Sequence, residues 1–405
     1  MSRTVLTDGR PNGRTETQSI VVEGGRIAEV LDAPPAPQPG ETRIDLGGEI
    51  VLPGFVDGHA HIDKSLWGEP WVRRTSEEIS MRQMFEDTLT DWQETTTPCA
   101  VRAARFLGEC VRQGTTSVRT LVDVAPQIGL AGVDDVLKVK EAFGPMVDLS
   151  VVAFAQLGLL SNPGTAELLD EALSRGGLDG VAGLDPANID GDAGRSLDAV
   201  FGLAAKHGVA VDFHLHESGE LGRWLITQIA DRAREHGMEG RVSLCDVFSL
   251  ADASPDELDR TGAVLAEAGI AVAVGVHGLL PVPDVRRLHA LGVPMCLGSD
   301  SSRSRWSPWG EGDILSRATF LAYKSYFRRD DDLEFALSMG TSLGRDALGL
   351  EPCDLAAGDP ADLVVLPGQA LGEIVVVPPR RTLVMKSGEI VARDGALLHT
   401  PVLGD

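Results

Sequence analysis

Two histidines and two charged residues lie together in the stretch GHAHIDKS at residues 58–65, which continues the apolar run IVLPGFVDG. On an extended chain His59 and His61 leave the backbone on the same face, because side chains alternate along a strand. Burying imidazoles and charges at the end of an apolar strand costs free energy unless they bind something. The stretch therefore either satisfies a local hydrogen-bonding requirement or holds something that polarises a substrate.

Polar residues recur at the ends of the other apolar runs. Five of the nine histidines follow such runs, with carboxylates beside them. A lone histidine would suggest a structural role, whereas this clustering indicates a functional site. The residues are, in chain order, His59, His61, Asp123, Gln156, Asp185, His214, His216, Glu217, Asp246, His277 and Asp300.

Four of these residues form a typical metal-binding set. His59, His61 and His214 offer imidazole nitrogens, and Asp300 adds a carboxylate oxygen. Three histidines and one carboxylate, with room left for water, suit Zn²⁺ or Fe²⁺. Such an ion lowers the pKa of bound water toward about 7 and supplies hydroxide at neutral pH. Glu217, three residues after His214, can take the proton from that water and return it to a leaving nitrogen. The alternative for Glu217 is a carboxylate that interacts with the start of a helix.

The elements that must position these residues alternate regularly. Short apolar runs are separated by stretches with helical periodicity, and Ser254 followed by Asp256 and Glu257 indicates the start of one helix. Such alternation over roughly 300 residues predicts a (β/α)8 TIM barrel, an α/β fold whose chemistry lies at the carboxyl ends of its strands. The alternative, a doubly wound open sheet, would normally show a Gly-x-Gly-x-x-Gly turn, which the sequence lacks. The apolar runs are 50–58, 115–124, 147–156, 178–185, 208–216, 241–248, 269–276 and 292–300.

Strand-like segments also occur at both ends of the chain. Residues 1–50 and 355–405 predict a small β-sandwich domain beside a metal-dependent catalytic barrel of residues 51–354. The Ser-Gly pair in VMKSGEIVA predicts a hairpin turn between two strands of that domain.

Composition excludes several classes of partner. The net charge of −24 argues against nucleic acid and anionic membrane surfaces. The sequence contains no run of 18 apolar residues, so it predicts no membrane span, and the first residues lack the apolar segment of a signal peptide. The five cysteines are scattered without Cys-x-x-Cys spacing, which favours a reduced, cytoplasmic protein.

Three segments together resemble the amidohydrolase superfamily, and within it the branch of cytosine deaminase and N-isopropylammelide isopropylaminohydrolase. They are VLPGFVDGHAHIDKS at 51–65, DFHLHE at 212–217 and LGSDSS at 297–302. The resemblance covers essentially the whole chain, including VVAFAQLGLLS at 151–161, GLDPAN at 183–188 and the GDPADLVVLPG ending.

This resemblance implies a site with one divalent ion, Zn²⁺ or Fe²⁺, with Mn²⁺ as a further option. Relatives with two metals bridge them through a lysine at the end of the fourth strand, and GVAGLDPAN at 180–188 has none. The resemblance also implies that Glu217 shuttles the proton and that Gln156 hydrogen-bonds the substrate ring. The ligands it implies are His59, His61, His214 and Asp300.

The chain departs from the pattern of this branch at three positions. Asp246 stands where a histidine is usual at the end of the sixth strand, and Leu121 replaces a histidine on the second. Ser301 stands where cytosine deaminases carry an aspartate that contacts the ring, so cytosine itself is not the expected substrate. Asp246 is predicted to pair with Lys64 of the His-x-His-x-Asp-Lys motif, to bind an N–H-rich substrate, or to act as a base. Together, Lys64 and Asp246 are expected to set the substrate.

Other residues near the predicted site have two possible roles. Trp67 and Trp71 either stack on a substrate ring or pack their loop, and His277 either contacts substrate or binds a backbone carbonyl. His216 faces away from His214 on an extended strand and is expected to play a supporting role, as is Asp63.

The resulting hypothesis is a metal-dependent hydrolase that removes an exocyclic amine, as ammonia or an alkylamine, from a nitrogen heterocycle such as a pyrimidine, pterin or triazine. One alternative is hydrolysis of a cyclic or N-substituted amide by the same groups. Another is a binding or scaffold protein that has lost its chemistry. The separate nucleoside-deaminase fold is excluded because PCAVR at 98–102 lacks a second cysteine. The expected partner is a small heterocycle, and self-association is an expectation from the resemblance alone.

Overall fold

Within residues 3–73, 80–278 and 280–403, which the computed structural model describes, eight strands pair in parallel in their sequence order. The barrel closes between its last and first strands: the backbone N–H of Asp300 donates to the carbonyl of His59 (2.9 Å), and that of His61 to the carbonyl of Asp300 (3.3 Å). Residues of the predicted site therefore form the seam. The strands are β6 (Phe55–Ala60), β7 (Thr115–Asp123), β8 (Asp148–Phe154), β9 (Gly180–Leu184), β10 (Ala210–His214), β11 (Val242–Cys245), β12 (Ala271–Gly275) and β13 (Met295–Gly298).

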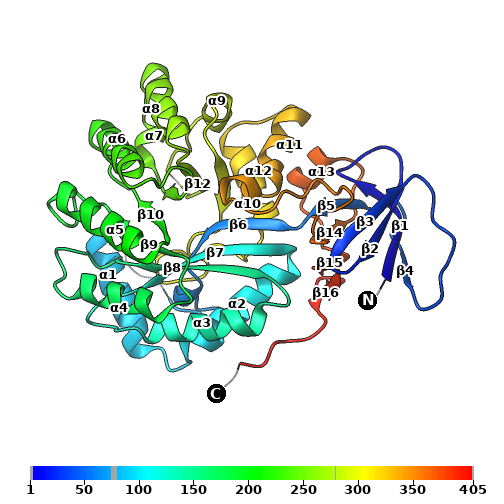
Figure 1. The fold of residues 1–405 in the computed structure, drawn as a ribbon, viewed down its shortest axis with the longest axis horizontal. Coiled ribbons are helices and arrows are strands. Elements are labelled where there is room, and N and C mark those ends of the chain that lie inside the picture. Colours follow the sequence, from blue (N-terminus) through cyan, green and yellow to red (C-terminus); the bar gives the residue numbers. More distant parts are fainter. Residues whose placement is uncertain (1–2, 74–79, 279, 404–405) are drawn as a thin grey trace.

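Helices surround this barrel (Figure 1). Helix α8 begins as predicted, because Ser254 and Glu257 form a reciprocal capping box at its start. The helices are α1 (Met81–Glu94), α2 (Cys99–Arg112), α3 (Ala131–Phe143), α4 (Thr165–Arg175), α5 (Ala193–His207), α6 (Gly219–Glu235), α7 (Phe248–Ala251), α8 (Pro255–Glu267), α9 (Val285–Ala290), α10 (Ile314–Lys324), α11 (Asp330–Ser338), α12 (Ser342–Ala347) and α13 (Leu371–Val376), with a 3-10 turn η1 at Ile62–Lys64. In the described part of the chain, no helix is both long enough and apolar enough to span a bilayer.

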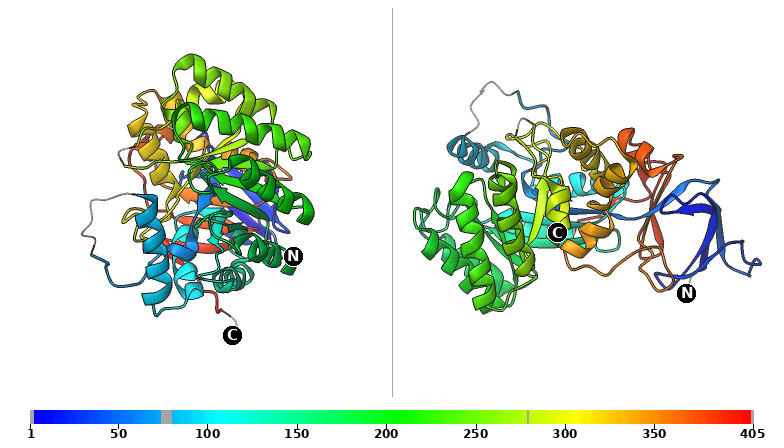
Figure 2. Two further views of the ribbon diagram at one scale, coloured as in Figure 1. Left: turned by 90° about the vertical axis from the view of Figure 1, so that its left-hand side faces the viewer. Right: turned by 90° about the horizontal axis from the view of Figure 1, so that it is seen from above.

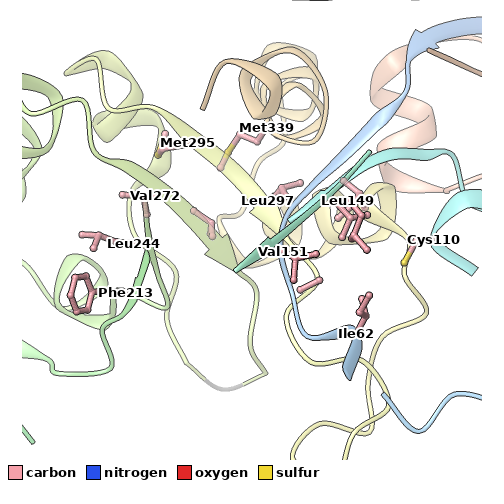
Figure 3. Close-up of a cluster of buried hydrophobic side chains, with 14 of the residues drawn as sticks. Ile62, Cys110, Leu149, Val151, Phe213, Leu244, Val272, Met295, Leu297 and Met339 are labelled. Carbon is pink, nitrogen blue, oxygen red and sulfur yellow. The ribbon is translucent and has the colours of Figure 1, made fainter. Parts of the chain in front are cut away.

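The hydrophobic core lies between the strands and the helices. Because side chains alternate along a strand, those of the core face outward from the barrel and those of the site face inward. Phe213, Leu244, Val272 and Met295 are register partners on β10, β11, β12 and β13, so they form one layer, part of which is drawn in Figure 3. Phe213 stacks on Phe201 of α5 at 6.2 Å and therefore faces outward. Because successive side chains alternate, the next residue, His214, faces the inside of the barrel.

Strands from both ends of the chain form a separate mixed sheet beside the barrel, as the right-hand view of Figure 2 shows. Buried side chains from both halves of this sheet, among them Leu6, Ile20, Leu363 and Met385, pack into one cluster. The predicted fold is therefore confirmed, including the hairpin of the last strands. The strands are β1 (Arg3–Pro11), β2 (Gln18–Glu23), β3 (Arg26–Leu31), β4 (Thr42–Asp45), β5 (Ile50–Pro53), β14 (Leu363–Leu366), β15 (Leu383–Lys386), β16 (Glu389–Arg393) and β17 (Ala396–Leu397).

One predicted strand is in fact two. The run at 50–58 divides into β5, which pairs with β1 and β14 in the terminal sheet, and β6, the first barrel strand. The chain passes between the sheets at Gly54, where a Cβ would lie 2.3 Å from the Thr116 side chain. Only glycine fits this close approach. The division of the chain into domains at 50/51 and 354/355 stays a prediction.

Candidate metal centre and active site

The three predicted histidine ligands and Asp300 meet at the carboxyl end of the barrel. His61 Nε2 lies 3.1 Å from His214 Nε2 and 3.4 Å from Asp300 Oδ1, and His59 Nε2 lies 3.7 Å from the same oxygen. All three imidazoles are buried. Strands β6, β10 and β13 thus bring together residues that lie far apart in the sequence.

These four residues fit a divalent cation. Both ring nitrogens of His59 are buried without a hydrogen-bond partner, as is Nδ1 of His214. Burial holds the pKa of His61 and of His214 well below the usual range, an effect that neighbouring positive charges reinforce. The rings of His61 and His214 are therefore neutral and have lone pairs for a metal. Burial lowers the pKa of His59, but the carboxylates of Asp300 and Asp246 outweigh burial and raise it. Burial raises the pKa of Asp300, but the neighbouring imidazoles of His59, His277 and His61 outweigh it and hold this pKa below its usual range, so Asp300 stays ionised.

A nearby thiol is also within reach of this cluster but is a poor ligand. Cys245 Sγ lies with ligand atoms of His59, His214 and Asp246 inside a 4.8 Å group. Burial and the neighbouring carboxylates raise the pKa of the Cys245 thiol well above its usual value. Cys245 therefore stays protonated. It is a poor ligand because the thiolate is the form that binds metal. Sequence reasoning did not single it out.

Glu217 is held in place from the neighbouring strand rather than by its own helix. Its Oε1 accepts hydrogen bonds from the backbone N–H groups of Ala187 (2.9 Å) and Asn188 (2.8 Å), in the loop after β9. Its Oε2 is buried without a partner. Burial, together with the charge of Asp185, raises the pKa of Glu217 to about 7. A carboxyl group with one fixed oxygen, one open oxygen and a pKa near 7 is suited to general acid–base work.

Gln156 follows strand β8 and turns its amide toward helix α1. Its Nε2 donates to Thr88 Oγ1 (3.0 Å), which fixes the amide plane, while Oε1 is buried without a partner. The free oxygen is able to accept a hydrogen bond from a bound ring, and that role stays a prediction.

The contacts of Lys64 differ from the prediction, because Lys64 does not pair with Asp246. Its Nζ lies 2.8 Å from Asp123 Oδ1 and 2.9 Å from His61 Nδ1. The strand ends at Ala60 and the chain turns into η1, which directs Lys64 toward Asp123 and His61. The ammonium group also lies over the rings of Phe154 and Trp306, at 5.3 and 5.2 Å.

The Lys64–Asp123 pair predicts a measurable effect on stability. Burial raises the pKa of Asp123 to about 7, and Lys64 is the first of the groups that lower it. In Lys64→Met the carboxylate loses its cation, and breaking a buried pair costs about 3–5 kcal/mol. We expect urea unfolding at pH 8 to show this loss, and a smaller one at pH 5, where Asp123 is protonated. Adding Asp123→Asn should restore most of the stability. A double variant no more stable than the single one would contradict the pairing.

Asp246 pairs instead with two histidines. Its Oδ1 lies 2.6 Å from His277 Nε2, and its Oδ2 lies 3.7 Å from His216 Nε2. These imidazoles hold the pKa of Asp246 well below its usual range despite burial, and Asp246 raises the pKa of His277 to about 9. His216 also binds Asp185, and against the effect of burial the two carboxylates raise its pKa to about 10. The ring of His277 therefore has a carboxylate as its partner, rather than the backbone carbonyl considered above.

The two predicted tryptophans lie in the chain segment after η1 and contact residues of α2 and of the loop after β13. Trp67 packs at 6.0 Å against Phe106, and the guanidinium of Arg303 lies over the rings of both Trp67 and Trp71. Trp71 is 63% exposed. The tryptophan that lies against His61, at 6.1 Å, is Trp306 in the loop after β13, which sequence reasoning missed. Substrate stacking by Trp67 and Trp71 stays a prediction.

Two further aspects of the site come from the backbone and from a buried hydroxyl. Ser301 is buried and its Oγ has no partner, so its predicted contact with substrate stays open to test. Asp185, Asp246 and Asp300, each just beyond a strand, have positive φ values of 39°, 53° and 52°. Such conformations cost free energy and cluster at functional sites. No sequence motif predicts these backbone conformations.

Comparison with known proteins agrees with this geometry. A profile described as "Amidohydrolase family" matches residues 72–392. N-isopropylammelide isopropyl amidohydrolase from Pseudomonas sp. (strain ADP) is 30% identical over 88% of this chain and 89% of its own. The crystal structure of N-isopropylammelide isopropylaminohydrolase from Burkholderia multivorans matches with TM-score 0.94 and 36% identity, over 98% of this chain and 100% of that one. That of 5-methylcytosine deaminase from Klebsiella pneumoniae matches with TM-score 0.82 and 25% identity, over 98% and 100%. This chain is therefore a member of the amidohydrolase family, a hydrolase acting on carbon–nitrogen bonds other than peptide bonds.

Proposed function

We propose that this protein removes an alkylamine or ammonia from a carbon of a nitrogen heterocycle by metal-dependent hydrolysis, with an alkylamino-triazine of the N-isopropylammelide type as the first substrate to test. The observation that carries the proposal is the cluster of His59, His61, His214 and Asp300, together with Glu217 three residues after His214. The second carboxylate oxygen of Glu217 has no hydrogen-bond partner, and its pKa is about 7. Relatives named for an N-isopropylammelide substrate match nearly the full length of the chain.

His59, His61, His214 and Asp300 would hold one divalent ion, Zn²⁺, Fe²⁺ or Mn²⁺. Such an ion lowers the pKa of water toward about 7, which supplies hydroxide at neutral pH. Glu217 takes the proton from the attacking water through Oε2 and returns it to the amine nitrogen as the C–N bond breaks. Gln156 and Ser301 orient the ring, Gln156 through its open amide oxygen. Lys64 holds the orientation of the His61 ring through its contact with Nδ1.

The second candidate is hydrolysis of a cyclic or N-substituted amide, which the same water and the same Glu217 would serve. The two reactions differ in their products, because hydrolysis of a ring amide opens the ring and leaves the exocyclic amine attached. A scaffold without chemistry is disfavoured, since no structural role is evident for three buried imidazoles, the carboxylate of Asp300 and a buried carboxylate oxygen of Glu217 without a partner.

The proposal extends to the setting of the protein. All five cysteines are free and buried, which favours the reducing cytoplasm. The partner is a small heterocycle. Self-association is expected from the exposed aromatic side chains of Phe320, Tyr323 and Tyr326 around α10.

The experiment that tests the function is an amine-release assay on protein loaded with Zn²⁺, Fe²⁺ or Mn²⁺. The panel should include N-isopropylammelide, amino-pyrimidines, amino-pterins and cyclic amides. We expect free amine from an amino heterocycle and none from the metal-free protein. Metal-loaded protein that is inert toward the whole panel would favour the scaffold alternative.

A further inference from the structure

Helix α10 and the turn after it carry three exposed aromatic side chains, which we call the aromatic face. Phe320, Tyr323 and Tyr326 are 50%, 86% and 75% exposed, and the two tyrosines are the only ones in the chain. Residues three apart share one face of a helix. The backbone N–H of Tyr326 donates to the carbonyl of Tyr323 (3.2 Å), which continues this spacing past the helix end. Exposed apolar side chains that gather in this way mark an interaction surface.

Neighbouring elements extend this apolar surface. Thr319 Oγ1 donates to the carbonyl of Val375 in α13 (2.6 Å), and the two valines that follow Val375 have exposed side chains. Further along α10, Lys324 donates to the carbonyl of Leu280, whose side chain is also exposed. At about 150–250 Å² for a fully buried aromatic side chain, the aromatic face alone offers about 400 Å². One partner in a stable interface contributes about 800 Å², so the aromatic face and its surroundings suffice for a dimer.

The charge of this segment favours a second copy of the chain as the partner. Residues 314–329 contain four basic and no acidic residues, whereas the whole chain has a net charge of −24. Two copies therefore repel one another over most of their surfaces but not here. Asp330 and Asp331, which follow directly, are exposed. When both copies use the same surface, the basic end of one segment meets these carboxylates of the other, and the contact is complementary in charge.

Helix α10 also holds two backbone segments of the candidate active site. Lys324 donates to three carbonyl oxygens in the segment that begins at His277. Arg317 Nη2 donates to the carbonyl of Ser299 (2.7 Å), the residue directly before Asp300. Both basic side chains belong to the helix that carries the aromatic face. Covering that face stabilises α10 against local opening and, with it, the backbone that α10 holds.

We propose that the aromatic face joins two copies of this chain about a two-fold axis, and that this contact stabilises the backbone at His277 and before Asp300 through α10. Assembly and the metal-type site are thus coupled through one helix, so dissociation loosens the site without removing any of its residues. Because this coupling regulates the same site, it rests on the proposed function, but its mass, cross-linking and exchange measurements need no substrate.

Tyr323→Glu is the variant that separates the copies. Tyr323 is largely exposed, so the substitution should leave the chain folded, which circular dichroism verifies. Carboxylates brought together in the interface repel one another. We expect light scattering to give an even multiple of the mass of one chain for the wild type and at most half that mass for Tyr323→Glu. The matched control is Trp224→Glu, since Trp224 is a half-exposed aromatic residue on α6. It should keep the wild-type mass.

Cross-linking reports the contact itself, because the chain has only these two tyrosines. Photo-oxidation couples tyrosine rings that touch, so the wild type should yield a covalent pair of chains with dityrosine fluorescence. The double variant Tyr323→Phe, Tyr326→Phe keeps the aromatic rings. It should retain the wild-type mass and lose the dityrosine signal.

Hydrogen exchange and metal binding measure the coupling to the site. The backbone N–H groups of Ser299 and Asp300 donate to Asp57 and to His59, so their exchange reports opening of the backbone that α10 holds. We expect these amides and those of α10 to exchange at least about tenfold faster in Tyr323→Glu than in the wild type or Trp224→Glu. Zn²⁺ should bind more weakly to Tyr323→Glu as well.

A wild type with the mass of one chain overturns the proposal, as does a Tyr323→Glu protein of wild-type mass or a wild-type assembly without dityrosine. Exchange rates and Zn²⁺ affinity that are unchanged in dissociated Tyr323→Glu overturn the coupling. In the kinetic arm, kcat for N-isopropylammelide should fall in Tyr323→Glu and not in Trp224→Glu, and equal values overturn the coupling. A wild type that meets the mass, cross-linking and exchange expectations but releases amine from no substrate overturns the proposed function and leaves the assembly standing.

Discussion

Glu217→Gln should abolish amine release while leaving the protein folded and able to bind metal. The amide still accepts the backbone hydrogen bonds from Ala187 and Asn188 through its oxygen, so the local structure is kept. What it loses is the ability to take and return a proton at the position of Oε2. General acid–base groups contribute about 10²–10⁴-fold to rate, and we expect kcat to fall within or beyond that range. Initial rates of amine formation measure this directly.

The matched control for this variant is Glu220→Gln. Glu220 is exposed in the first turn of α6, three residues further along, and the same substitution there should leave kcat unchanged. If Glu217→Gln kept activity within about tenfold of the wild type, Glu217 would not be the proton shuttle.

Glu217→Gln should also raise the stability of the folded protein above neutral pH. The pKa of Glu217 is about 7 in the folded protein and near its ordinary value of 4.5 when unfolded. The unfolded chain therefore releases its proton at lower pH, so ionisation of Glu217 destabilises the fold progressively between these values and fully above about 7. Glutamine carries no charge and escapes this cost. We expect Glu217→Gln to melt at a higher temperature than the wild type at pH 8 and at a similar temperature at pH 4.

His214→Ala should remove both the metal and the activity. Losing residues that merely orient metal ligands typically costs 10–100-fold in affinity, so losing a ligand should weaken binding by at least about 100-fold. A ligand present at about 100 times its Kd stabilises a folded protein by about 2.7 kcal/mol. Wild-type protein should accordingly melt at a higher temperature with added Zn²⁺ than with chelator, and His214→Ala should lose this difference.

His399→Ala is the control, since His399 is exposed near the carboxyl end of the described chain. It should keep the metal-dependent shift in melting temperature. A His214→Ala protein with an undiminished shift would place the metal elsewhere.

The clustering of His59, His61, His214 and Asp300 could be predicted because each lies at or just beyond the end of an apolar strand, where alternation and parallel pairing determine direction. His59 and His61 share a face, and His214 follows the outward-facing Phe213. The same regularity predicted the barrel. Strand periodicity could not reveal that 50–58 serves two sheets, because both halves are fully buried and neither shows an alternation of buried and exposed residues.

Partners that depend on turns and on loops between strands escaped prediction. Lys64 lies in the η1 turn beyond the last residue of β6, so alternation no longer applied and its partner proved to be Asp123. Asp246 binds His277 from the neighbouring strand, a contact that no local pattern encodes. Trp306 reaches His61 from a loop after the last barrel strand, where its sequence neighbours carry no periodicity.

The most direct test of the central claim is mass spectrometry of the products formed from N-isopropylammelide in ¹⁸O-labelled water by metal-loaded protein. We expect free isopropylamine and an intact ring that has gained one ¹⁸O atom at the carbon that carried the amine. A ring-opened product that retains the isopropylamino group would contradict it and establish amide hydrolysis instead.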